Sequence, residues 1–451
     1  MSDVHGETLF SKRALTRNTK QRSDIHDMST GSNSQTYVNI VVLGAGYGGM
    51  ACVTRLARRF RSRPRIRIHL VDRHTYHLLE TRLHERAVRS TEITIPIARF
   101  LARRSNITFH LGEVTRINLE DARIELDYGI SDAAASAPRS IRYDYLVIAL
   151  GSKTNYYQIP GLETRAFQLK ELEDSDRIRA HTERMFAIAS TETNRNKRKE
   201  LLRFVIGGGG LTGVELATEL AERFDGLCEQ FHIDHSEPEM LLLELSDRLL
   251  PRLDGRQVSK SVEAMQAMGI QIVTGTRVMG MEESNGSLVV LREPGEPLPT
   301  RTMIWTGGIR ISDLLQRSGA DTGTQGRALV DEALQLTGHP GVFAIGDNAL
   351  AINPDTGMTV PAAAQFALQQ GALVAENLKR LIDGLAPKPY RPKVLGEVVS
   401  LGRHLAVGWA ALPFIPRIRF VGFLASLLKR AIAERHIFLL WKERQNWTGH
   451  W

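Results

Sequence analysis

Three glycines and one acidic residue near the start of the chain have the spacing that binds the pyrophosphate of a dinucleotide. Gly44, Gly46 and Gly49 form the pattern G-x-G-x-x-G, and Asp72 follows after a second apolar stretch. In this pattern one glycine permits a tight turn, one lets the phosphates approach the backbone, and one lets a helix pack against a strand. A carboxylate at the position of Asp72 can accept hydrogen bonds from a ribose diol.

The same set of residues recurs about one third of the chain later. Gly208, Gly210 and Gly213 repeat the glycine spacing, and Glu244 takes the place of the acid. Because a carboxylate repels a 2′-phosphate, Glu244 favours NADH over NADPH. Arg248 lies close by in the sequence and leaves NADPH open as the alternative.

Both sets need a strand before the glycines, a helix after them and a second strand that ends in the acid. In the first set the sequence predicts strands over Val38–Leu43 and Arg67–Val71 around a helix over Met50–Phe60. In the second set it predicts strands over Leu202–Ile206 and Met240–Leu243. This pattern is typical of an α/β protein with two Rossmann-like domains. Two such domains indicate a flavoprotein that holds FAD in one and a nicotinamide nucleotide in the other.

Three further apolar runs end in glycine and so add candidate ligand-binding turns. They end at Gly151, at Gly307 and at Gly346-Asp347. A carboxylate such as Asp347 at the carboxyl end of a strand is well placed to hold a polyol. After the first glycine unit in the sequence, residues Ile107–Leu111 are predicted to form a strand of a small antiparallel layer.

Composition narrows the functional classes. The 451 residues carry a net charge of +8 and have a pI near 9.5, which favours an anionic partner. Cys52 and Cys228 form no C-x-x-C pair, and no run of 18 uncharged apolar residues predicts a membrane-spanning helix. His74, His77 and His84 are interpreted as polar groups lining a loop near the flavin, so no metal site is predicted.

The C-terminal region changes in character after Pro387. Residues 396–409 are predicted to form a hairpin. Apolar residues then recur with helical spacing and predict an amphipathic helix; they are Phe420, Phe423, Leu424, Leu427, Leu428, Ala431 and Ile432. Lys429, Arg430 and Arg435 lie nearby, and three of the five tryptophans fall in the last 11 residues. Tryptophan and cations favour a membrane interface, so this helix is predicted to lie on a bilayer, with packing in a dimer interface as the alternative.

The order of these motifs resembles the two-dinucleotide-domain flavoproteins and, among them, the type II NADH:quinone oxidoreductases. A narrower mark is the stretch Ala364-Gln-Phe-Ala-Leu-Gln-Gln-Gly, which is similar to that family's A-Q-x-A-x-Q-Q motif. The family usually has an apolar stretch after the histidine segment, where this chain has Arg82 and Arg86. The resemblance implies transfer of a hydride from NADH to FAD, followed by two-electron reduction of a membrane quinone.

The resemblance also implies roles for individual residues. It implies that Glu215 lies near the nicotinamide ring and that Gln365 and Gln369 face the quinone headgroup. The implied FAD contacts are Gly44, Gly46, Gly49, Asp72, Gly151, Gly346 and Asp347. The implied NADH contacts are Gly208, Gly210, Gly213, Glu244 and Gly307.

The predicted domain organisation follows from these assignments. Residues 1–36 are polar and predicted to be a disordered tail. Residues 37–157 and 330–386 are predicted to bind FAD, residues 158–329 to bind NAD(P)H, and residues 387–451 to form the membrane or dimer region. The expected protein is a peripheral homodimer on the cytoplasmic side of the cell membrane.

Two other functional classes remain open from the sequence. A sulfide:quinone oxidoreductase or disulfide reductase would share the architecture, but it needs a cysteine pair at the flavin. A nucleic-acid-binding protein with a redox-sensing flavin would suit the basic pI. No helix-turn-helix or base-stacking platform supports it, so no nucleic-acid partner is predicted.

Overall fold

The computed structural model describes residues 37–102, 104–128, 139–284, 286–412, 415–423, 425–427 and 429. From Val38 on, these residues belong to one unit. The predicted tail 1–36 lies outside the described residues, as do Leu424, Leu428 and every residue after Lys429. The C-terminal tryptophans are therefore not described.

The first sheet has five parallel strands in the order β21-β9-β1-β2-β5. Its strands are β1 (Val38–Leu43), β2 (Ile66–Asp72), β5 (Ile107–Leu111), β9 (Tyr145–Ile148) and β21 (Val342–Ala344). The prediction that Ile107–Leu111 joins an antiparallel layer was wrong, because this segment pairs in parallel with β2. Its alternating pattern reflects its place at the edge of the sheet, where one face stays partly exposed.

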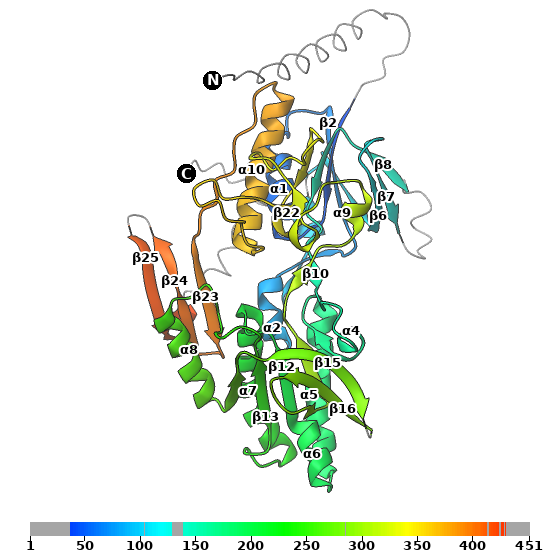
Figure 1. The fold of residues 1–451 in the computed structure, drawn as a ribbon. Coiled ribbons are helices and arrows are strands. Elements are labelled where there is room, and N and C mark those ends of the chain that lie inside the picture. The colour runs from blue at the N-terminus through cyan, green and yellow to red at the C-terminus, as the bar shows by residue number, and fades with distance from the viewer. Residues whose placement is uncertain are drawn as a thin grey trace, which may run out of the picture. The chain divides into compact units, whose positions relative to one another are not determined.

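Each face of the first sheet has its own cover (Figure 1). Helices α1 (Tyr47–Arg59) and α10 (Ala364–Ile382) pack on one face with side chains such as Ile40 and Leu70. On the other face lie the antiparallel strands β6 (Glu113–Asn118), β7 (Arg123–Asp127) and β8 (Ser140–Arg142), together with the short helix α9 (Leu314–Arg317).

The second sheet repeats this plan. It is parallel in the order β11-β18-β12-β13-β14. Its strands are β11 (Phe167–Gln168), β12 (Arg203–Gly207), β13 (Glu239–Leu243), β14 (Ile270–Val273) and β18 (Thr302–Trp305). Helices α5 (Leu172–Thr191) and α7 (Leu211–Phe231) cover one face, and the antiparallel strands β15 (Arg277–Ser284), β16 (Ser287–Glu293) and β17 (Leu298–Pro299) cover the other. The internal repeat predicted from the glycine motifs thus extends to the layers on both faces.

The C-terminal region forms a three-stranded antiparallel sheet of β23 (Gly396–Leu401), β24 (Leu405–Leu412) and β25 (Ile415–Gly422). It contacts α7 and α8 (Gly255–Ala267). The hairpin prediction is confirmed, but the prediction of a helix starting at Phe420 was wrong. Phe420 lies in β25 opposite Gly408, and helical residues begin at Phe423. A β-strand that follows a hairpin can satisfy its backbone hydrogen bonds by pairing, which the apolar spacing alone did not reveal.

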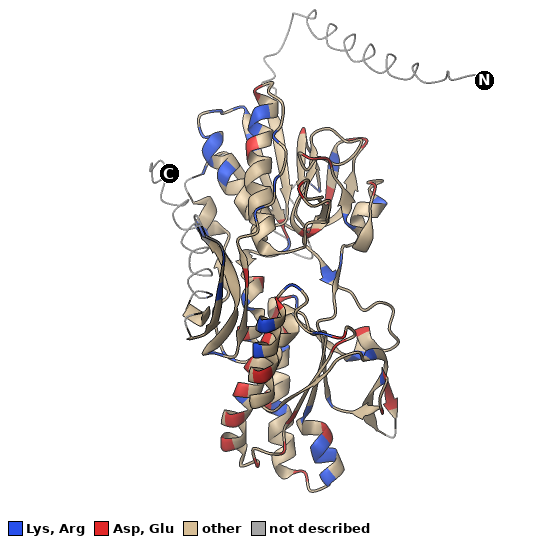
Figure 2. Ribbon diagram, turned by 60° about the vertical axis from the view of Figure 1, so that its left-hand side comes forward, with Lys and Arg blue, Asp and Glu red and all other residues tan. Residues whose placement is uncertain are grey.

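The charged segment after α5 forms a helix, α6 (Arg195–Leu202). Asn194 caps it by accepting hydrogen bonds from the backbone amides of Asn196 and Lys197. Its basic residues have acidic partners, since Arg198 pairs with Glu237 and Lys199 pairs with Glu239. Figure 2 shows basic and acidic residues interspersed in this part of the molecule.

Short elements complete the described structure. They are β3 (Tyr76–Leu78), η1 (Glu80–Arg82), α2 (Leu83–Arg86), β4 (Thr94–Pro96), α3 (Ala98–Leu101), β10 (Lys153–Thr154), α4 (Leu162–Arg165), β19 (Ile309–Arg310), η3 (Thr324–Gly326), β20 (Ala328–Leu329), η4 (Gly346–Asn348) and β22 (Ala349–Leu350). No helix among the described residues is long and apolar enough to cross a membrane.

Candidate functional site

The loop between β1 and α1 uses each of its three glycines differently. Gly44 has a φ of +96°, and a Cβ there would lie 2.2 Å from the carbonyl oxygen of Ala149. A Cβ on Gly49 would lie 1.8 Å from the carbonyl oxygen of Gly44, so only glycine lets the helix pack this close. A Cβ on Gly46 would meet no atom within 4 Å. The loop is therefore tight on the protein side and open on the side of Gly46, which fits a bound pyrophosphate.

The acid of the first unit is fixed by the loop that it faces. Asp72 ends β2, and its carboxylate accepts hydrogen bonds from the backbone amides of Ala45 at 2.6 Å and His74 at 2.8 Å. A carboxylate offers about four lone-pair positions, so positions remain for a ribose diol.

The second glycine loop has the same construction. Gly208 has a φ of +110°, and a Cβ there would lie 2.9 Å from the Cα atom of Gly307. A Cβ on Gly213 would lie 1.9 Å from the carbonyl oxygen of Gly208, whereas one on Gly210 would meet no atom within 4 Å. The predicted residue Gly307 is thus brought against the loop.

Glu244 reproduces the contacts of Asp72. Its carboxylate accepts hydrogen bonds from the amides of Gly209 at 2.6 Å and Ser246 at 2.8 Å. The guanidinium group of Arg248 donates to the carbonyl oxygen of Leu253 at 2.6 Å. Arg248 is therefore engaged by the backbone, and contact of Glu244 with a ribose stays a prediction.

The turns after β9 and β21 meet at the carboxyl edge of the first sheet. The hydroxyl group of Ser152 donates to the carboxylate of Asp347 at 2.5 Å, and the amide of Gly151 donates to the side-chain oxygen of Asn348 at 3.1 Å. The predicted residues Gly151, Gly346 and Asp347 are thus brought together. Ser152 and Asn348 were not among the predicted site residues, although both adjoin predicted residues in the sequence.

The histidines His77 and His84 lie in two different surroundings. His77 is fully buried, and its Nδ1 lies 2.8 Å from the carbonyl oxygen of Ala45, so it braces the first glycine loop. Burial lowers the pKa of His77, which keeps the ring neutral. His84 instead approaches Glu215, with 3.5 Å between Nδ1 and Oε2. Among the described residues, no three His, Cys, Asp or Glu side chains are grouped to hold a metal ion.

Glu215 lies in a buried polar cluster whose four side chains come from separate parts of the chain. Its carboxylate accepts hydrogen bonds from Lys429 Nζ and from the backbone amide of Ser400, the latter at 3.1 Å. Lys429 also donates to the hydroxyl oxygen of Ser400 at 2.7 Å. Burial opposes the charged carboxylate, but the charge of Lys429 and the hydrogen bonds from Lys429 and Ser400 hold the pKa of Glu215 below its usual value. Glu215 is therefore an anion at neutral pH.

The cluster corrects one expectation and adds residues that the sequence did not reveal. Lys429 was grouped with cations that meet lipid headgroups, but it points inward to Glu215. His84, Ser400 and Lys429 come from segments far from Glu215 in the sequence, so no local signal could have identified them.

Gln365 and Gln369 hold the linker that leads into β23. Gln369 donates to the carbonyl oxygen of Lys393 at 2.8 Å and accepts from its amide at 2.9 Å. Gln365 donates to the carbonyl oxygen of Gly396 at 3.1 Å and accepts from the amide of Leu395 at 2.9 Å. Each amide group keeps one N–H and one acceptor position. Contact with a quinone therefore stays a prediction for both residues.

The two arginines that depart from the family pattern have acidic partners. Arg82 pairs with Glu85 on the same turn, and Arg86 forms two hydrogen bonds to Asp176 at 2.9 and 3.0 Å. Because Asp176 belongs to α5, Arg86 joins the segment after the first glycine unit to the second sheet's helices.

Both cysteines are buried free thiols on different helices, Cys52 on α1 and Cys228 on α7. Burial raises the pKa of Cys52 to about 12 and that of Cys228 to about 11, so both stay protonated and unreactive. This chemistry disfavours the disulfide reductase and sulfide:quinone oxidoreductase alternatives.

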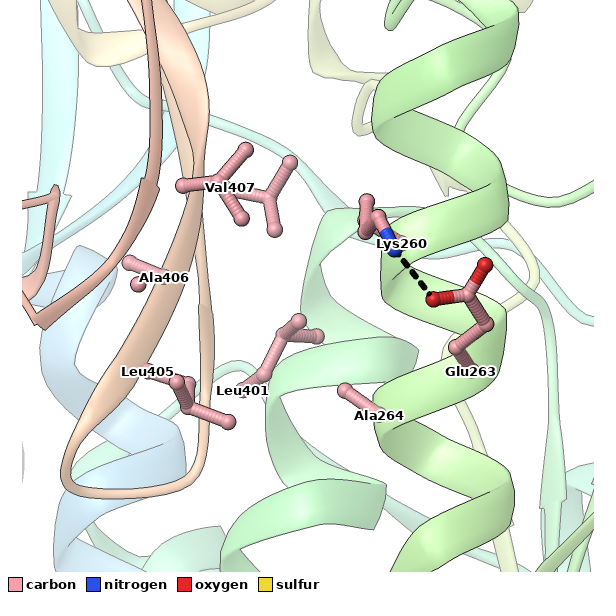
Figure 3. A pocket seen from close by; sticks show the side chains of 9 residues that line it. Lys260, Glu263, Ala264, Leu401, Leu405, Ala406 and Val407 are labelled. Carbon is pink, nitrogen blue, oxygen red and sulfur yellow. Dashed lines mark hydrogen bonds and ion pairs between the residues drawn. The ribbon is translucent and has the colours of Figure 1, made fainter.

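A separate hollow of about 310 Å³ lies between α8 and the C-terminal sheet (Figure 3). Its lining is mainly apolar and includes Leu401, Leu405 and Val407, with the ion pair Lys260–Glu263 at its rim. None of the predicted site residues lines it.

Comparisons with known proteins agree with this geometry. The family described as pyridine nucleotide-disulphide oxidoreductase matches residues 38–371. The type II NADH:quinone oxidoreductase of Staphylococcus epidermidis is 30% identical over 410 residues, and the match covers 90% of this chain and 97% of that protein. The protein of the same name from Staphylococcus aureus is 29% identical, covering 90% and 96%.

Two solved structures share the fold. The structure of NDH2 from Plasmodium falciparum in complex with NADH has a TM-score of 0.76 at 20% identity and covers 90% of this chain and 96% of its own. The sulfide:quinone oxidoreductase of Aquifex aeolicus has a TM-score of 0.70 at 20% identity, covering 90% and 92%. The chain belongs to the pyridine nucleotide-disulphide oxidoreductase family and, within it, to the type II NADH:quinone oxidoreductases.

Proposed function

We propose that this chain is an FAD-dependent NADH:quinone oxidoreductase that does not pump protons. The observation that supports it best is the repeated unit, in which a glycine loop and a backbone-bound carboxylate occur once in each sheet. Residues 37–157 and 330–386 are assigned to FAD and residues 158–329 to NADH, except that α9 packs on the first sheet. Bound FAD would take a hydride from NADH and pass two electrons to the quinone.

The first unit would hold FAD through the open side of Gly46, the amino terminus of α1 and the carboxylates of Asp72 and Asp347. The first turn of α1 carries no acidic residue, so its amide groups and positive dipole end face the phosphates without competition. Asp347 would bind the ribityl hydroxyl groups while Ser152 keeps its carboxylate oriented. Gly151 and Gly346 would bring backbone close to the flavin.

The second unit would hold NADH in the same way through Gly210, Gly213 and Glu244, with Gly307 beside the loop. The first turn of α7 also lacks an acidic residue. Glu244 would accept hydrogen bonds from the free 2′- and 3′-hydroxyl groups of the adenosine ribose and repel a 2′-phosphate. The engagement of Arg248 with Leu253 supports this preference for NADH.

Glu215 would orient the nicotinamide ring rather than donate a proton. Its lowered pKa leaves no proton on the carboxylate at neutral pH, and Lys429 and Ser400 fix its direction. A fixed anion in a buried site favours the partial positive charge that the nicotinamide ring gains as its hydride leaves.

The acceptor side would be formed by α10 and the linker into β23. The free N–H groups of Gln365 and Gln369 are assigned to the quinone carbonyl oxygens. The exposed apolar residues Val421, Phe423 and Leu427, with exposed fractions of 54%, 57% and 43%, support membrane contact by the C-terminal region. We assign the protein to the cytoplasmic face of the membrane as a peripheral homodimer.

Anaerobic absorbance spectroscopy tests the proposal. NADH should bleach the flavin absorbance of the purified protein. A quinone should then restore the absorbance rapidly when it is mixed with the reduced protein in a stopped-flow experiment. A colourless protein that takes up no FAD, or a reduced flavin that quinones leave unchanged, would overturn the proposed function.

A further inference from the structure

One partly buried lysine, Lys170, pairs with an acid on the segment that follows β3. Lys170 lies between β11 and α5, where its backbone amide donates to the carboxylate of Asp174 at 3.0 Å. Its ammonium group lies 3.0 Å from the carboxylate of Glu80, which belongs to η1 in the first unit. Both ends of Lys170 are thus fixed, its backbone by Asp174 and its ammonium group by Glu80.

One hydrogen bond links the residue next to Glu80 with the first glycine loop. Glu80 follows Asp72 along the chain, and its neighbour Thr81 is hydrogen-bonded at 2.9 Å to the hydroxyl group of Tyr47, the residue after Gly46. The Lys170 side chain is 18% exposed, whereas that of Glu80 is 39% exposed. The ammonium group is therefore the more deeply enclosed member of the pair.

Lys170 stays charged in this enclosure. Burial by itself lowers the pKa of Lys170, but Glu80 and then Asp347 outweigh it and leave the pKa raised. The charge of Lys170 is thus held by Glu80 at 3.0 Å and is also attracted by Asp347, the acid assigned to the ribityl chain.

We propose that Lys170 faces the bound flavin and stabilises its electron-rich reduced form, and that Glu80 holds Lys170 in place and moderates that effect. The inference rests on the proposed function, because it assumes that the first unit binds FAD. A reduced flavin carries more negative charge on its ring than an oxidised one, and a nearby cation favours it. A bare interdomain ion pair would join the two units but would not change the flavin's tendency to take electrons.

Opposite shifts in two variants test the proposal. The ratio of oxidised to reduced flavin is measured by absorbance at equilibrium with a reference dye under anaerobic conditions. Lys170→Met should shift this ratio toward oxidised flavin by about tenfold, because Glu80 and Asp347 then act without a counter-charge. Glu80→Gln should shift it toward reduced flavin. The double variant should fall between the two single variants, since the opposing charges are removed together.

The ion pair Lys260–Glu263 on α8 is the matched control (Figure 3). Its atoms are 2.6 Å apart, its side chains are 57% and 60% exposed, and Lys260→Met and Glu263→Gln should leave the ratio unchanged. Equal ratios in Glu80→Gln and the parent protein, or shifts of the same sign in both single variants, would overturn the proposal. Because Glu80 is partly exposed, its variant remains decisive if Lys170→Met folds poorly. A protein that binds flavin but does not reduce quinone would contradict only the proposed function.

Discussion

Asp72 and Glu244 make the same contact in the two halves of the chain. Each carboxylate accepts a hydrogen bond at 2.6 Å from the amide one residue after the first glycine of its loop, and a second at 2.8 Å from the amide two residues after itself. The acid and the phosphate-binding loop are therefore one rigid assembly in each unit. A ligand that meets the acid is placed on the loop at the same time.

Replacement of Glu244 should weaken NADH binding and leave the flavin in place. Glu244→Gln removes the charge and puts a donor against the amide of Gly209 or Ser246. Since a hydrogen bond to a charged group contributes about 1.5–3 kcal/mol, KM for NADH should rise about tenfold or more. The preference over NADPH should fall, because the repulsion of a 2′-phosphate is lost. Steady-state kinetics with both nucleotides checks this result, and the exposed Glu282→Gln is the control.

An unchanged KM for NADH in Glu244→Gln would contradict the assignment of the second unit to NADH. A loss of flavin absorbance would point instead to damage that spreads beyond the second glycine loop.

The glycines of the first loop should respond differently to alanine. Gly46→Ala places a methyl group in open space, so the unfolding temperature without flavin should stay close to that of the parent, while flavin content falls. Gly49→Ala places it 1.8 Å from the carbonyl oxygen of Gly44, so the protein should fail to fold. Absorbance and thermal unfolding measure the two effects. Full flavin content in Gly46→Ala would argue against phosphate binding at this position.

Glutamine-to-leucine variants test the linker contact of α10. Gln369→Leu removes the hydrogen bonds to both backbone groups of Lys393 and should destabilise the protein by about 1–2 kcal/mol. Because the remaining N–H group of Gln369 is assigned to a quinone carbonyl, KM for the quinone should also rise while reduction of the flavin by NADH stays fast. Denaturant unfolding and stopped-flow absorbance separate the two effects. The exposed Gln266→Leu is the control, and an unchanged quinone KM would remove Gln369 from the acceptor side.

The glycine units could be predicted because every part of them is local. Each unit lies within one stretch of chain that holds a strand, three spaced glycines, a helix and an acid. The unit from Gly44 to Asp72 recurs from Gly208 to Glu244, and this recurrence supports the prediction independently. Ile107–Leu111 was assigned to the wrong layer because an edge strand of a parallel sheet shows the same alternation as an antiparallel strand.

The cluster around Glu215 could not be predicted from the sequence. His84, Ser400 and Lys429 meet Glu215 only through tertiary packing, and Lys429 carried a local pattern that suggested a surface cation. Lys170 and Glu80 are likewise ordinary charged residues until the fold brings them together. Long-range electrostatic pairs leave no trace in the spacing of a single chain.

The pH dependence of stability provides a test of the buried histidine in this cluster. Burial lowers the pKa of His84 from 6.5 to about 4, so the ring is neutral in the folded protein. Between these values the unfolded chain binds more protons than the folded one, and stability therefore falls as the pH falls. Full stability is present above pH 6.5. From pH 7 to pH 5 the single ring accounts for a loss of about 2 kcal/mol, because each unit of pKa shift corresponds to about 1.4 kcal/mol.

His84→Gln should remove the contribution of this ring. The free energy of unfolding, measured with denaturant, should then fall by about 2 kcal/mol less between pH 7 and pH 5 than it does in the parent protein. Some dependence should remain, because burial also lowers the pKa of His110 and of His181 to about 4. The exposed His235→Gln is the matched control and should keep the slope of the parent. If His84→Gln keeps that slope as well, burial does not hold the His84 ring neutral beside Glu215.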